Sequence, residues 1–292
     1  MKTPKPLLPL IEDGIVDEVI SQLMSGKEAS VFSVRCGDEI RCAKVYKDAA
    51  QRSFKKAVQY REGRSVRNSR RGRAMEKGSK FGRQQQEAVW QNAEVEALYR
   101  LEAAGVRVPH PYGCFAGVLL MDLVTDDEGN VAPRLNDVSM SAEQAREDHA
   151  EMMEAVKLML VEGIIHGDLS EFNVLVDDYG PVIIDLPQAV NAAGNNNAFA
   201  MLERDVRNMT QYYGQYAPEL LHSQYAHEMW ALYEEGELKP DTELTGQFEA
   251  PTESADVDAV MQSIKAALAE EDARLARLRD SDEDELNQRP FT

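Results

Sequence analysis

A twenty-residue stretch, 166–185, constrains this chain more than any other part of its sequence. It holds two short apolar triplets, VLV and VII, on either side of the turn-forming letters DDYG. Triplets rich in valine and isoleucine around such a turn are typical of a small β-hairpin. A short loop and a hairpin of this length bring the polar residues that flank the triplets to one place. We therefore expect Asp168, Asn173 and Asp185 to line a common cleft.

These three side chains have the chemistry that phosphoryl transfer from a nucleotide requires. The reaction needs a carboxylate that orients the attacking hydroxyl and accepts its proton, and oxygen ligands that hold magnesium against the phosphates. Asp168 suits the first role, and Asn173 and Asp185 supply the hard oxygen donors that Mg²⁺ prefers. Taken singly, each acid is better explained as a turn residue, but their combined spacing argues for a site. His166 is expected to brace the loop by hydrogen bonding rather than to transfer protons.

Nucleotide-dependent transfer also needs a lysine near the phosphates, and a candidate lies upstream. Lys44 falls inside the apolar, strand-like run 41–46, where a charge requires a partner or a ligand. A helix predicted over residues 84–104 carries Glu94, which we expect to pair with Lys44. Without the downstream motif, an ordinary edge-strand lysine would be the better interpretation.

The run SGKEASVF, residues 25–32, lies between two strand-like runs, where a loop that covers a nucleotide belongs. Ser25 and Lys27 are its candidates for contacts with phosphates. The run holds a single glycine, so it matches neither the G-x-G-x-x-G loop nor the Walker A loop. On its own it is weak evidence for nucleotide binding.

The remaining patterning predicts a β-rich first third and a mostly helical remainder with a small β insert. Ser141 begins a helix with a capping-box pattern, and Gly163 ends it. Residues 236–254 are typical of a linker, and an apolar face predicts a packing helix over 255–279 before an acidic tail. Further strands are expected at 30–34, 40–45 and 114–121, and further helices at 198–214 and 218–235.

The charge of the chain is unevenly distributed. Its 51 acidic and 32 basic residues give a formal charge of −19, yet the stretch 52–83 holds 12 basic residues and two acids, a local charge of +10. The other 260 residues therefore carry −29. A uniformly acidic surface would argue against a general nucleic-acid binder, but the charge of this chain is not uniform. The basic stretch has few large apolar residues, so we expect it to form a flexible loop.

The sequence predicts neither a membrane protein nor a disulfide scaffold. The longest uncharged run, 186–202, contains a proline and four asparagines, and the N-terminus is a poor signal peptide. Cys36, Cys42 and Cys114 are too few for a disulfide framework and are expected to be reduced core thiols. We therefore expect a soluble, cytoplasmic protein with no membrane partner.

Five stretches together resemble the RIO family of atypical serine/threonine protein kinases, nearest its type-1 branch. They are SGKEASVF, CAKVYK, WQNAE, HGDLSEFNVLV and VIIDLPQAV, and the basic stretch 52–83 resembles the flexible loop of that branch. The similarity covers residues 10–235. It implies an α+β, two-lobed protein-kinase-like fold with a β-rich N-lobe and a reduced helical C-lobe. The expected domains are 1–121 for the N-lobe, 122–235 for the C-lobe, and 236–292 for the linker, helix and tail.

The resemblance also implies how a nucleotide would bind. It implies ATP as the cofactor, with Mg²⁺ or alternatively Mn²⁺. Lys44 would be the nucleotide lysine and Glu94 its partner on the helix. Met121 to Leu123 would form the hinge whose backbone binds adenine.

For the transfer step, the resemblance implies Asp168 as the catalytic aspartate and Asn173 and Asp185 as the metal ligands. In this family the aspartate at the position of Asp185 is also implied to accept phosphate transiently, which would give ATPase activity. The sequence departs from ordinary protein kinases in two ways, because DLP replaces DFG at Asp185 and Gly167 replaces the arginine of HRD. Control by an arginine that pairs with a phosphorylated loop is therefore not expected.

Two alternatives to a protein kinase stay open at this point. The HGDL motif with a downstream Ile-Asp also occurs in aminoglycoside and choline phosphotransferases, so a small-molecule kinase is the first alternative. The second is a nucleotide-gated assembly factor that binds RNA or a ribosomal particle through the block from Arg52 to Arg83. A loop that covers the cleft or binds an acidic peptide is a slightly better interpretation of that block. The expected partners of the kinase are a protein substrate and the chain itself, by autophosphorylation.

Overall fold

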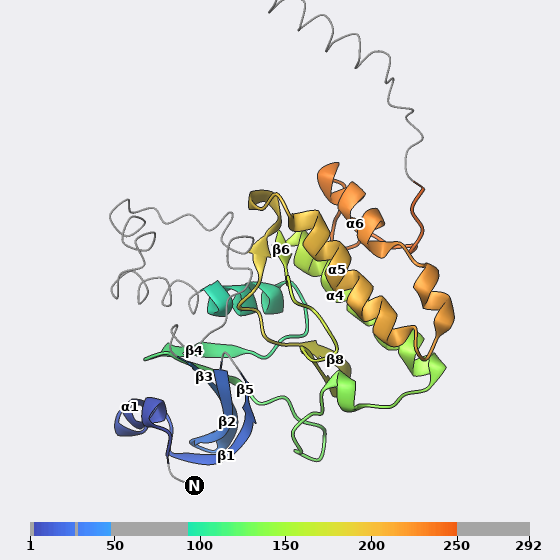
Figure 1. Ribbon diagram of the computed structural model, residues 1–292. Helices are drawn as coiled ribbons and strands as arrows, with labels where there is room; N and C mark the ends of the chain where they lie inside the picture. Colours follow the sequence, from blue (N-terminus) through green and yellow to red (C-terminus); the bar gives the residue numbers. More distant parts are fainter. Residues whose placement is uncertain (1–2, 27–28, 48–92, 250–292) are drawn as a thin grey trace, which may run out of the picture. The chain divides into compact units, whose positions relative to one another are not determined.

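The computed structural model describes residues 3–26, 29–47 and 93–249 of the 292. The basic stretch 52–83 and the predicted helix 255–279 lie outside the described residues. A five-stranded antiparallel sheet forms the first part of the fold, with the strand order β1-β2-β3-β5-β4 (Figure 1). The strands are β1 (Glu18–Ser25), β2 (Ala29–Cys36), β3 (Glu39–Tyr46), β4 (Pro111–Phe115) and β5 (Val118–Asp122).

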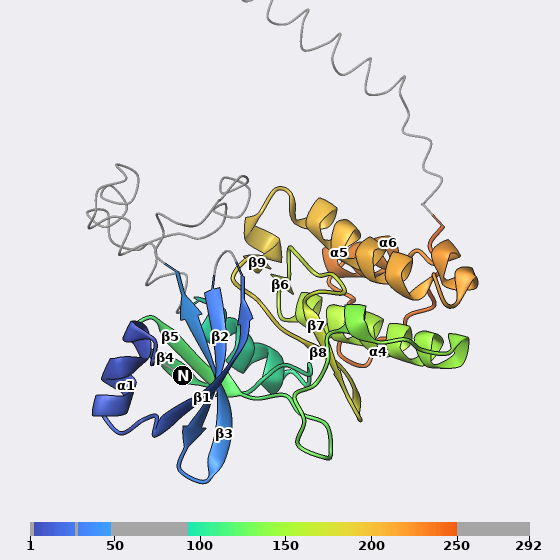
Figure 2. The ribbon, with the colours of Figure 1, turned by 60° about the horizontal axis from the view of Figure 1, so that its bottom comes forward.

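The two faces of this sheet contact different apolar clusters. Val118 and Leu120 of β5 join a small cluster with the short helix α1 (Leu8–Glu12), which packs beside the sheet (Figure 2). Leu119, between them in sequence, joins a larger cluster that includes residues of the helical segment 93–103. Because successive side chains of a strand point to opposite faces, β5 connects both clusters.

The expected single strand over 114–121 is wrong, because the chain turns within it. Residues on both sides pair with each other as the β4–β5 hairpin. Ala116 and Gly117 form the turn with φ of 49° and 84°. Two consecutive residues with positive φ are the mark of a tight hairpin turn that follows the natural twist of the strands. The uninterrupted apolar sequence concealed this turn.

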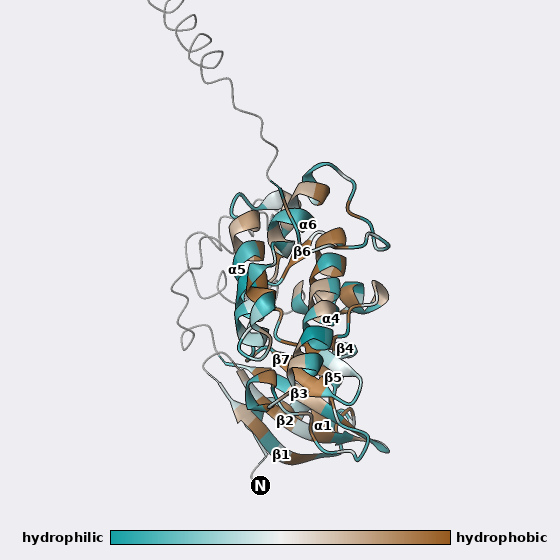
Figure 3. Ribbon diagram, turned by 90° about the vertical axis from the view of Figure 1, so that its right-hand side faces the viewer, coloured by the Kyte–Doolittle hydropathy of each residue, from teal (hydrophilic) through white to brown (hydrophobic). Residues whose placement is uncertain are grey.

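The second part of the fold is mostly helical and surrounds the larger cluster. Its helices are α4 (Ala142–Val161), α5 (Ala198–Tyr213) and α6 (Tyr225–Glu234). Figure 3 shows hydrophobic and hydrophilic residues alternating around the turns of α4 and α5, as expected for helices with one buried face. Ser141 caps α4 as expected, since its Oγ accepts a hydrogen bond of 3.1 Å from the backbone N–H of Gln144.

Four short strands complete this part of the fold. β7 (Val174–Asp177) and β8 (Gly180–Ile183) form the expected hairpin around the DDYG turn. β6 (Ile164–Ile165) pairs with β9 (Val190–Asn191). Among the described residues, no helix combines the length and the apolar character that crossing a bilayer needs.

The helix predicted over 218–235 is also wrong, since it is divided in two. Pro218–His222 forms a 3₁₀ helix, and α6 begins only at Tyr225. The Oγ of Ser223 donates a hydrogen bond of 2.7 Å to the carbonyl of Leu220, which removes an acceptor that a continuous helix would use. The N–H of Gln224 bonds to the carbonyl of Gly246 instead of to the preceding turn.

The chain after α6 stays in contact with the helices rather than leaving them at residue 236. Lys157 of α4, which is buried, donates hydrogen bonds of 2.8 Å to the carbonyls of Pro240 and Thr242. The carboxylate of Glu228 accepts hydrogen bonds of 2.7 Å from the backbone of Thr245 and Gly246. The first half of the expected linker is therefore attached to α4 and α6.

A buried histidine makes the stability of this helical part depend on pH. His149 of α4 is 1% exposed, lies beside the ring of Tyr213, and bonds through Nε2 to Oγ1 of Thr210 at 3.0 Å. Burial lowers the pKa of His149 to about 4. The unfolded chain binds a proton at this histidine with a pKa of about 6.5. Its stabilising contribution is therefore complete above pH 6.5 and is lost as the pH falls toward 4.

We expect the free energy of unfolding to fall by about 2 kcal/mol between pH 7.5 and pH 5 through His149 alone. Urea unfolding of the wild-type protein and of His149→Gln at both pH values measures this contribution, because glutamine keeps a hydrogen-bonding group and cannot titrate. The loss of stability with acid should be smaller in the variant. The same pH dependence in both proteins would refute the assignment to His149.

Candidate active site

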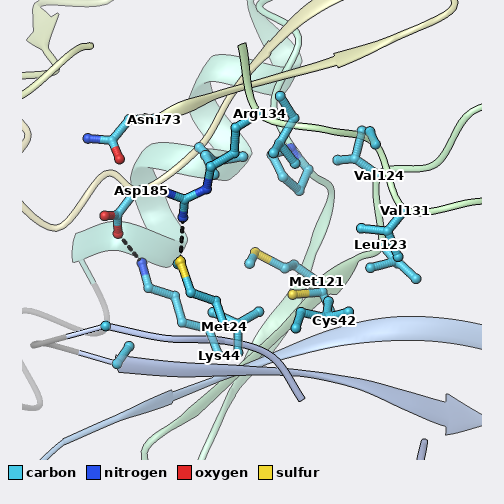
Figure 4. A pocket seen from close by; sticks show the side chains of 18 of the residues that line it. Met24, Cys42, Lys44, Met121, Leu123, Val124, Val131, Arg134, Asn173 and Asp185 are labelled. Carbon is cyan, nitrogen blue, oxygen red and sulfur yellow. Dashed lines mark hydrogen bonds and ion pairs between the residues drawn. The ribbon is translucent and has the colours of Figure 1, made fainter. Parts of the chain in front are cut away.

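A cavity of about 450 Å³ lies where the sheet faces the helical part, a size within the usual range for a small-molecule site. The four chemistry-bearing residues of the cleft that the sequence predicts all line it. They are Lys44, Asp168, Asn173 and Asp185. Figure 4 labels Lys44, Asn173 and Asp185 among the lining residues. The proposed hinge residues Met121 and Leu123 line the same cavity at the end of β5.

Lys44 reaches the cavity from β3, and its side chain is only 8% exposed. Its Nζ lies 2.7 Å from Oε1 of Glu94 and 2.5 Å from Oδ1 of Asp185. Burial by itself lowers the pKa of Lys44, but the carboxylates of Asp185 and Glu94 outweigh burial and raise it. The expected ion pair with Glu94 is present, and the same ammonium also binds the acid that follows the hairpin.

Glu94 has a second partner that the sequence analysis missed. It is the second residue of the described part of the helix, which runs over 93–103, and its side chain is 2% exposed. The hydroxyl of Tyr46 donates a hydrogen bond to its Oε2. Tyr46 lies two residues after Lys44 in β3, so both side chains point to the same face of the sheet. The two-residue spacing from Lys44 was the sequence signal that could have placed Tyr46 beside the ion pair.

Asp185 adopts an unusual backbone conformation, with φ of +70°. A residue other than glycine pays roughly 1 kcal/mol or more in this left-handed region, so the surroundings must hold it there. Burial would raise the pKa of Asp185, but the charges of Lys44 and, more weakly, Arg134 lower it instead. The carboxylate is thus kept ionised, and its side chain remains 43% exposed.

The loop that carries Asp168 is braced by His166, as the sequence predicts. Nε2 of His166 donates to the carbonyl of Ile184 at 3.1 Å, because a carbonyl oxygen can only accept. Its Nδ1 accepts from the backbone N–H of Asp168 at 3.3 Å. Both ring nitrogens are therefore occupied by the backbone of the two segments that carry the acids.

Asp205 of α5 holds the same loop and was not predicted. Its carboxylate accepts from the N–H groups of Gly167 and Leu169 at 2.7 and 3.0 Å. The side chain is almost wholly buried, and burial raises the pKa of Asp205 to about 6. The available signal was its position in the helical pattern, since Met201, Leu202, Val206 and Met209 place it on the apolar face.

Asn173 and Asp185 are suited to hold a divalent cation together with phosphate. Nδ2 of Asn173 donates a hydrogen bond to the carbonyl of Asp168 at 2.8 Å. The amide oxygen Oδ1 can then serve as a metal ligand. In the described part of the chain, no group of three or more His, Cys, Asp or Glu side chains is arranged around one metal position. One carboxylate and one amide oxygen, completed by phosphates and water, match the way Mg²⁺ is usually held.

Of the two residues proposed for the phosphate loop, Ser25 is not among the residues that line the cavity. Oγ of Ser25 lies 3.4 Å from Oγ of Ser30, while its neighbours Met24 and Gly26 do line the cavity. Lys27 lies outside the described residues. A different lysine contacts this loop, since Nζ of Lys47 donates to the carbonyl of Gly26 at 2.5 Å.

An antiparallel sheet and a helical part that enclose a cavity with a buried Lys–Glu pair define a two-lobed, protein-kinase-like fold. The profile of the RIO domain family matches residues 30–226, about two thirds of this chain. The chain belongs to the RIO domain family.

Named relatives support this membership. The RIO-type serine/threonine-protein kinase Rio1 of Haloferax volcanii is 35% identical over 207 residues, which cover 70% of this chain and 66% of that protein. The Methanocaldococcus jannaschii protein of the same description is 32% identical over 214 residues, 73% of this chain and 68% of its own length. The human serine/threonine-protein kinase RIO1 is 28% identical over 214 residues, 73% of this chain and 36% of its own length.

Proposed function

We propose that this chain is an ATP-dependent serine/threonine protein kinase of the RIO type. One observation carries the proposal. Lys44 binds Glu94 and Asp185 at the same time, in a cavity that Asp168 and Asn173 also line. Phosphoryl transfer depends on positioning and charge stabilisation more than on covalent chemistry, and these groups supply both.

The proposed roles follow from where the side chains lie. Lys44 positions the α- and β-phosphates of ATP, and Glu94 keeps the ammonium in place. Asp168, exposed at the cavity, orients the hydroxyl of a protein substrate and accepts its proton as the γ-phosphoryl group is transferred. Asn173 and Asp185 hold Mg²⁺, which, when bound, neutralises charge on the phosphates.

The backbone at Met121 to Leu123 is proposed to bind adenine, and residues 1–121 and 122–235 are proposed as the two lobes. ATPase activity is a further part of the proposal. In it, a carboxylate oxygen of Asp185 attacks the γ-phosphorus, ADP leaves, and water then hydrolyses the acyl phosphate. Orthophosphate is released and the carboxylate is restored.

Labelled ATP tests this function directly. The purified full chain is incubated with γ-labelled ATP and Mg²⁺, with and without a protein substrate such as casein, and in parallel with an aminoglycoside or choline. Label on serine or threonine of protein is expected, and label that hydroxylamine releases would identify the acyl phosphate. Label on the small molecules with none on protein would favour the small-molecule phosphotransferase instead.

We also propose that the protein acts in the cytoplasm. The three cysteines are thiols rather than disulfides, with Cys42 buried and Cys36 and Cys114 half-buried. Burial raises the pKa of Cys42 to about 12, so this thiol is a poor nucleophile. Thiols are the usual state of cysteine in a reducing compartment.

An RNA or ribosomal partner is a second candidate, and the charge of +10 on residues 52–83 is the observation that favours it. Arginine contacts to backbone phosphates would give an affinity that falls steeply with salt. Filter binding of structured RNA at 50 and 200 mM salt, compared with a six-site arginine-to-glutamine variant, tests it. If the variant retains RNA as well as the wild type, the RNA role is wrong, and the stretch would instead cover the cleft or bind an acidic peptide. The six sites are Arg61, Arg64, Arg67, Arg70, Arg71 and Arg73.

A further inference from the structure

A second cation enters the candidate active site from the wall opposite Lys44. Arg134 lies in the segment that joins β5 to α4, and it lines the cavity. Its backbone forms an isolated β-bridge with Leu175 of β7. The carbonyl of the preceding residue, Pro133, accepts a hydrogen bond of 3.0 Å from the N–H of Val176. The hairpin that orders Asn173 and Asp185 therefore also fixes the base of this side chain.

The side chain of Arg134 points into the cavity, where its guanidinium meets the sulfur of Met24, a side chain that reaches in from the sheet (Figure 4). Its Nη2 lies 2.6 Å from Sδ of Met24, in β1. A thioether is a weak hydrogen-bond acceptor, whereas a guanidinium carries five donors in a planar fork. Most of the hydrogen-bonding capacity of Arg134 is unused by this contact.

Five other described arginines, unlike Arg134, pair with a carboxylate. Arg107 binds both carboxylate oxygens of Asp177 at 2.7 and 2.8 Å, and Arg146 pairs with Glu219 at 2.5 Å. Within residues 3–26, 29–47 and 93–249, no carboxylate lies within 4.0 Å of the Arg134 guanidinium. Its charge nonetheless acts on Asp185 and lowers the pKa of that carboxyl.

The charge balance of the cavity shows what this guanidinium can bind. Lys44 is already shared between two carboxylates. Four acids line the cavity, Asp185 among them, against the two cations Lys44 and Arg134, so the lining carries more negative than positive charge. An anionic ligand therefore needs a cation whose donors are not engaged by carboxylates, and Arg134 is such a cation among the described residues. The four acids are Asp122, Asp137, Asp168 and Asp185.

We infer that Arg134 is a phosphate-binding residue of the nucleotide site. On binding, its guanidinium exchanges the thioether of Met24 for phosphate oxygens, which match the planar fork in geometry and charge. The two cations then hold the phosphate chain from opposite walls, Lys44 from the sheet and Arg134 from the helical part. The inference rests on the proposed function, because it assumes that the ligand of the cavity is a nucleotide.

Calorimetric titration of the full chain with Mg²⁺ and a non-hydrolysable ATP analogue, and separately with adenosine, tests the inference. Arg134→Met should lower the affinity for the analogue by about 10- to 100-fold, the usual contribution of a hydrogen bond to a charged group. Adenosine, which lacks phosphate, should bind with unchanged affinity. Arg134→Lys should retain part of the affinity for the analogue, since it keeps the charge but not the fork. Arg146→Met is the matched control, and it should bind both ligands like the wild type.

The outcomes separate this inference from the proposed function. If the wild type binds the analogue and Arg134→Met binds it equally well, Arg134 is not a phosphate ligand and the kinase proposal stands. If Arg134→Met loses affinity for the analogue and for adenosine by the same factor, Arg134 contacts the base or the ribose, and the inference is wrong. If the wild type does not bind the analogue, both proposals fail. Arg134→Gln gives the same readout should the methionine variant not fold.

Discussion

Asp168→Asn is expected to slow phosphoryl transfer by about 10³-fold, within the range attributed to a positioned general base. Asparagine keeps the size of the side chain and can still orient a hydroxyl, but it cannot accept the proton. The loop should remain in place, because the hydrogen bonds that hold it at this position use the backbone of Asp168. Its N–H bonds to His166 and its carbonyl accepts from Asn173. The affinity for Mg²⁺ and ATP should therefore change little.

Single-turnover transfer and calorimetric binding of the ATP analogue, measured on one preparation, separate these two effects. Asp178→Asn is a suitable control, because Asp178 is an exposed acid of the β7–β8 turn that does not line the cavity. Turnover near the wild-type rate in Asp168→Asn would remove Asp168 from the mechanism. A loss of binding equal to the loss of rate would give it a structural role instead.

Lys44→Met is expected to abolish turnover and to destabilise the protein by roughly 3 kcal/mol, because removing one partner of a buried ion pair leaves the other charge uncompensated. Glu94 is the reason for most of this loss. Its side chain is 2% exposed, whereas that of Asp185 is 43% exposed and retains contact with water. Urea unfolding at pH 7 measures the free-energy change.

The double variant Lys44→Met/Glu94→Gln separates stability from catalysis. Removing both charges should restore much of the lost stability, because glutamine leaves no buried charge and still accepts a hydrogen bond from Tyr46. Turnover should stay absent, since the cation that positions phosphate is still missing. If Lys44→Met is as stable as the wild type, or if the double variant is less stable than the single one, the interpretation of the ion pair is wrong.

Much of the candidate site could be predicted because its parts lie close together in the sequence. The loop from His166 and the hairpin up to Asp185 span twenty residues, so local patterning already brings their polar ends together. Lys44 and Glu94 were found by a different argument. A lysine inside an apolar strand requires a partner, and an acid on a nearby predicted helix supplies one.

For other residues of the site, the local pattern indicates at most which face of a strand or helix they occupy, and not their partner. Asp205 and Tyr46 are ordinary residues of a helix and a strand until packing brings them to the catalytic loop and to Glu94. Arg134 lies in an irregular segment without periodicity, and its backbone is placed beside the cavity by pairing with β7. The β4–β5 turn was missed because only one of its two positive-φ positions, Gly117, carries a turn-forming residue, while Ala116 gives no such signal.

The β2–β3 and β7–β8 hairpins, the Ser141 cap of α4 and the acids of the catalytic loop follow from the amino-acid sequence, because they depend on hydrogen bonds and apolar spacing between near neighbours. Tertiary structure alone decided that Lys44 binds Asp185 across 141 positions and that α5 holds the loop through Asp205. Such contacts form only when distant segments pack around a common core, and their energies come from burial and charge at that point. Sequence spacing does not encode either quantity.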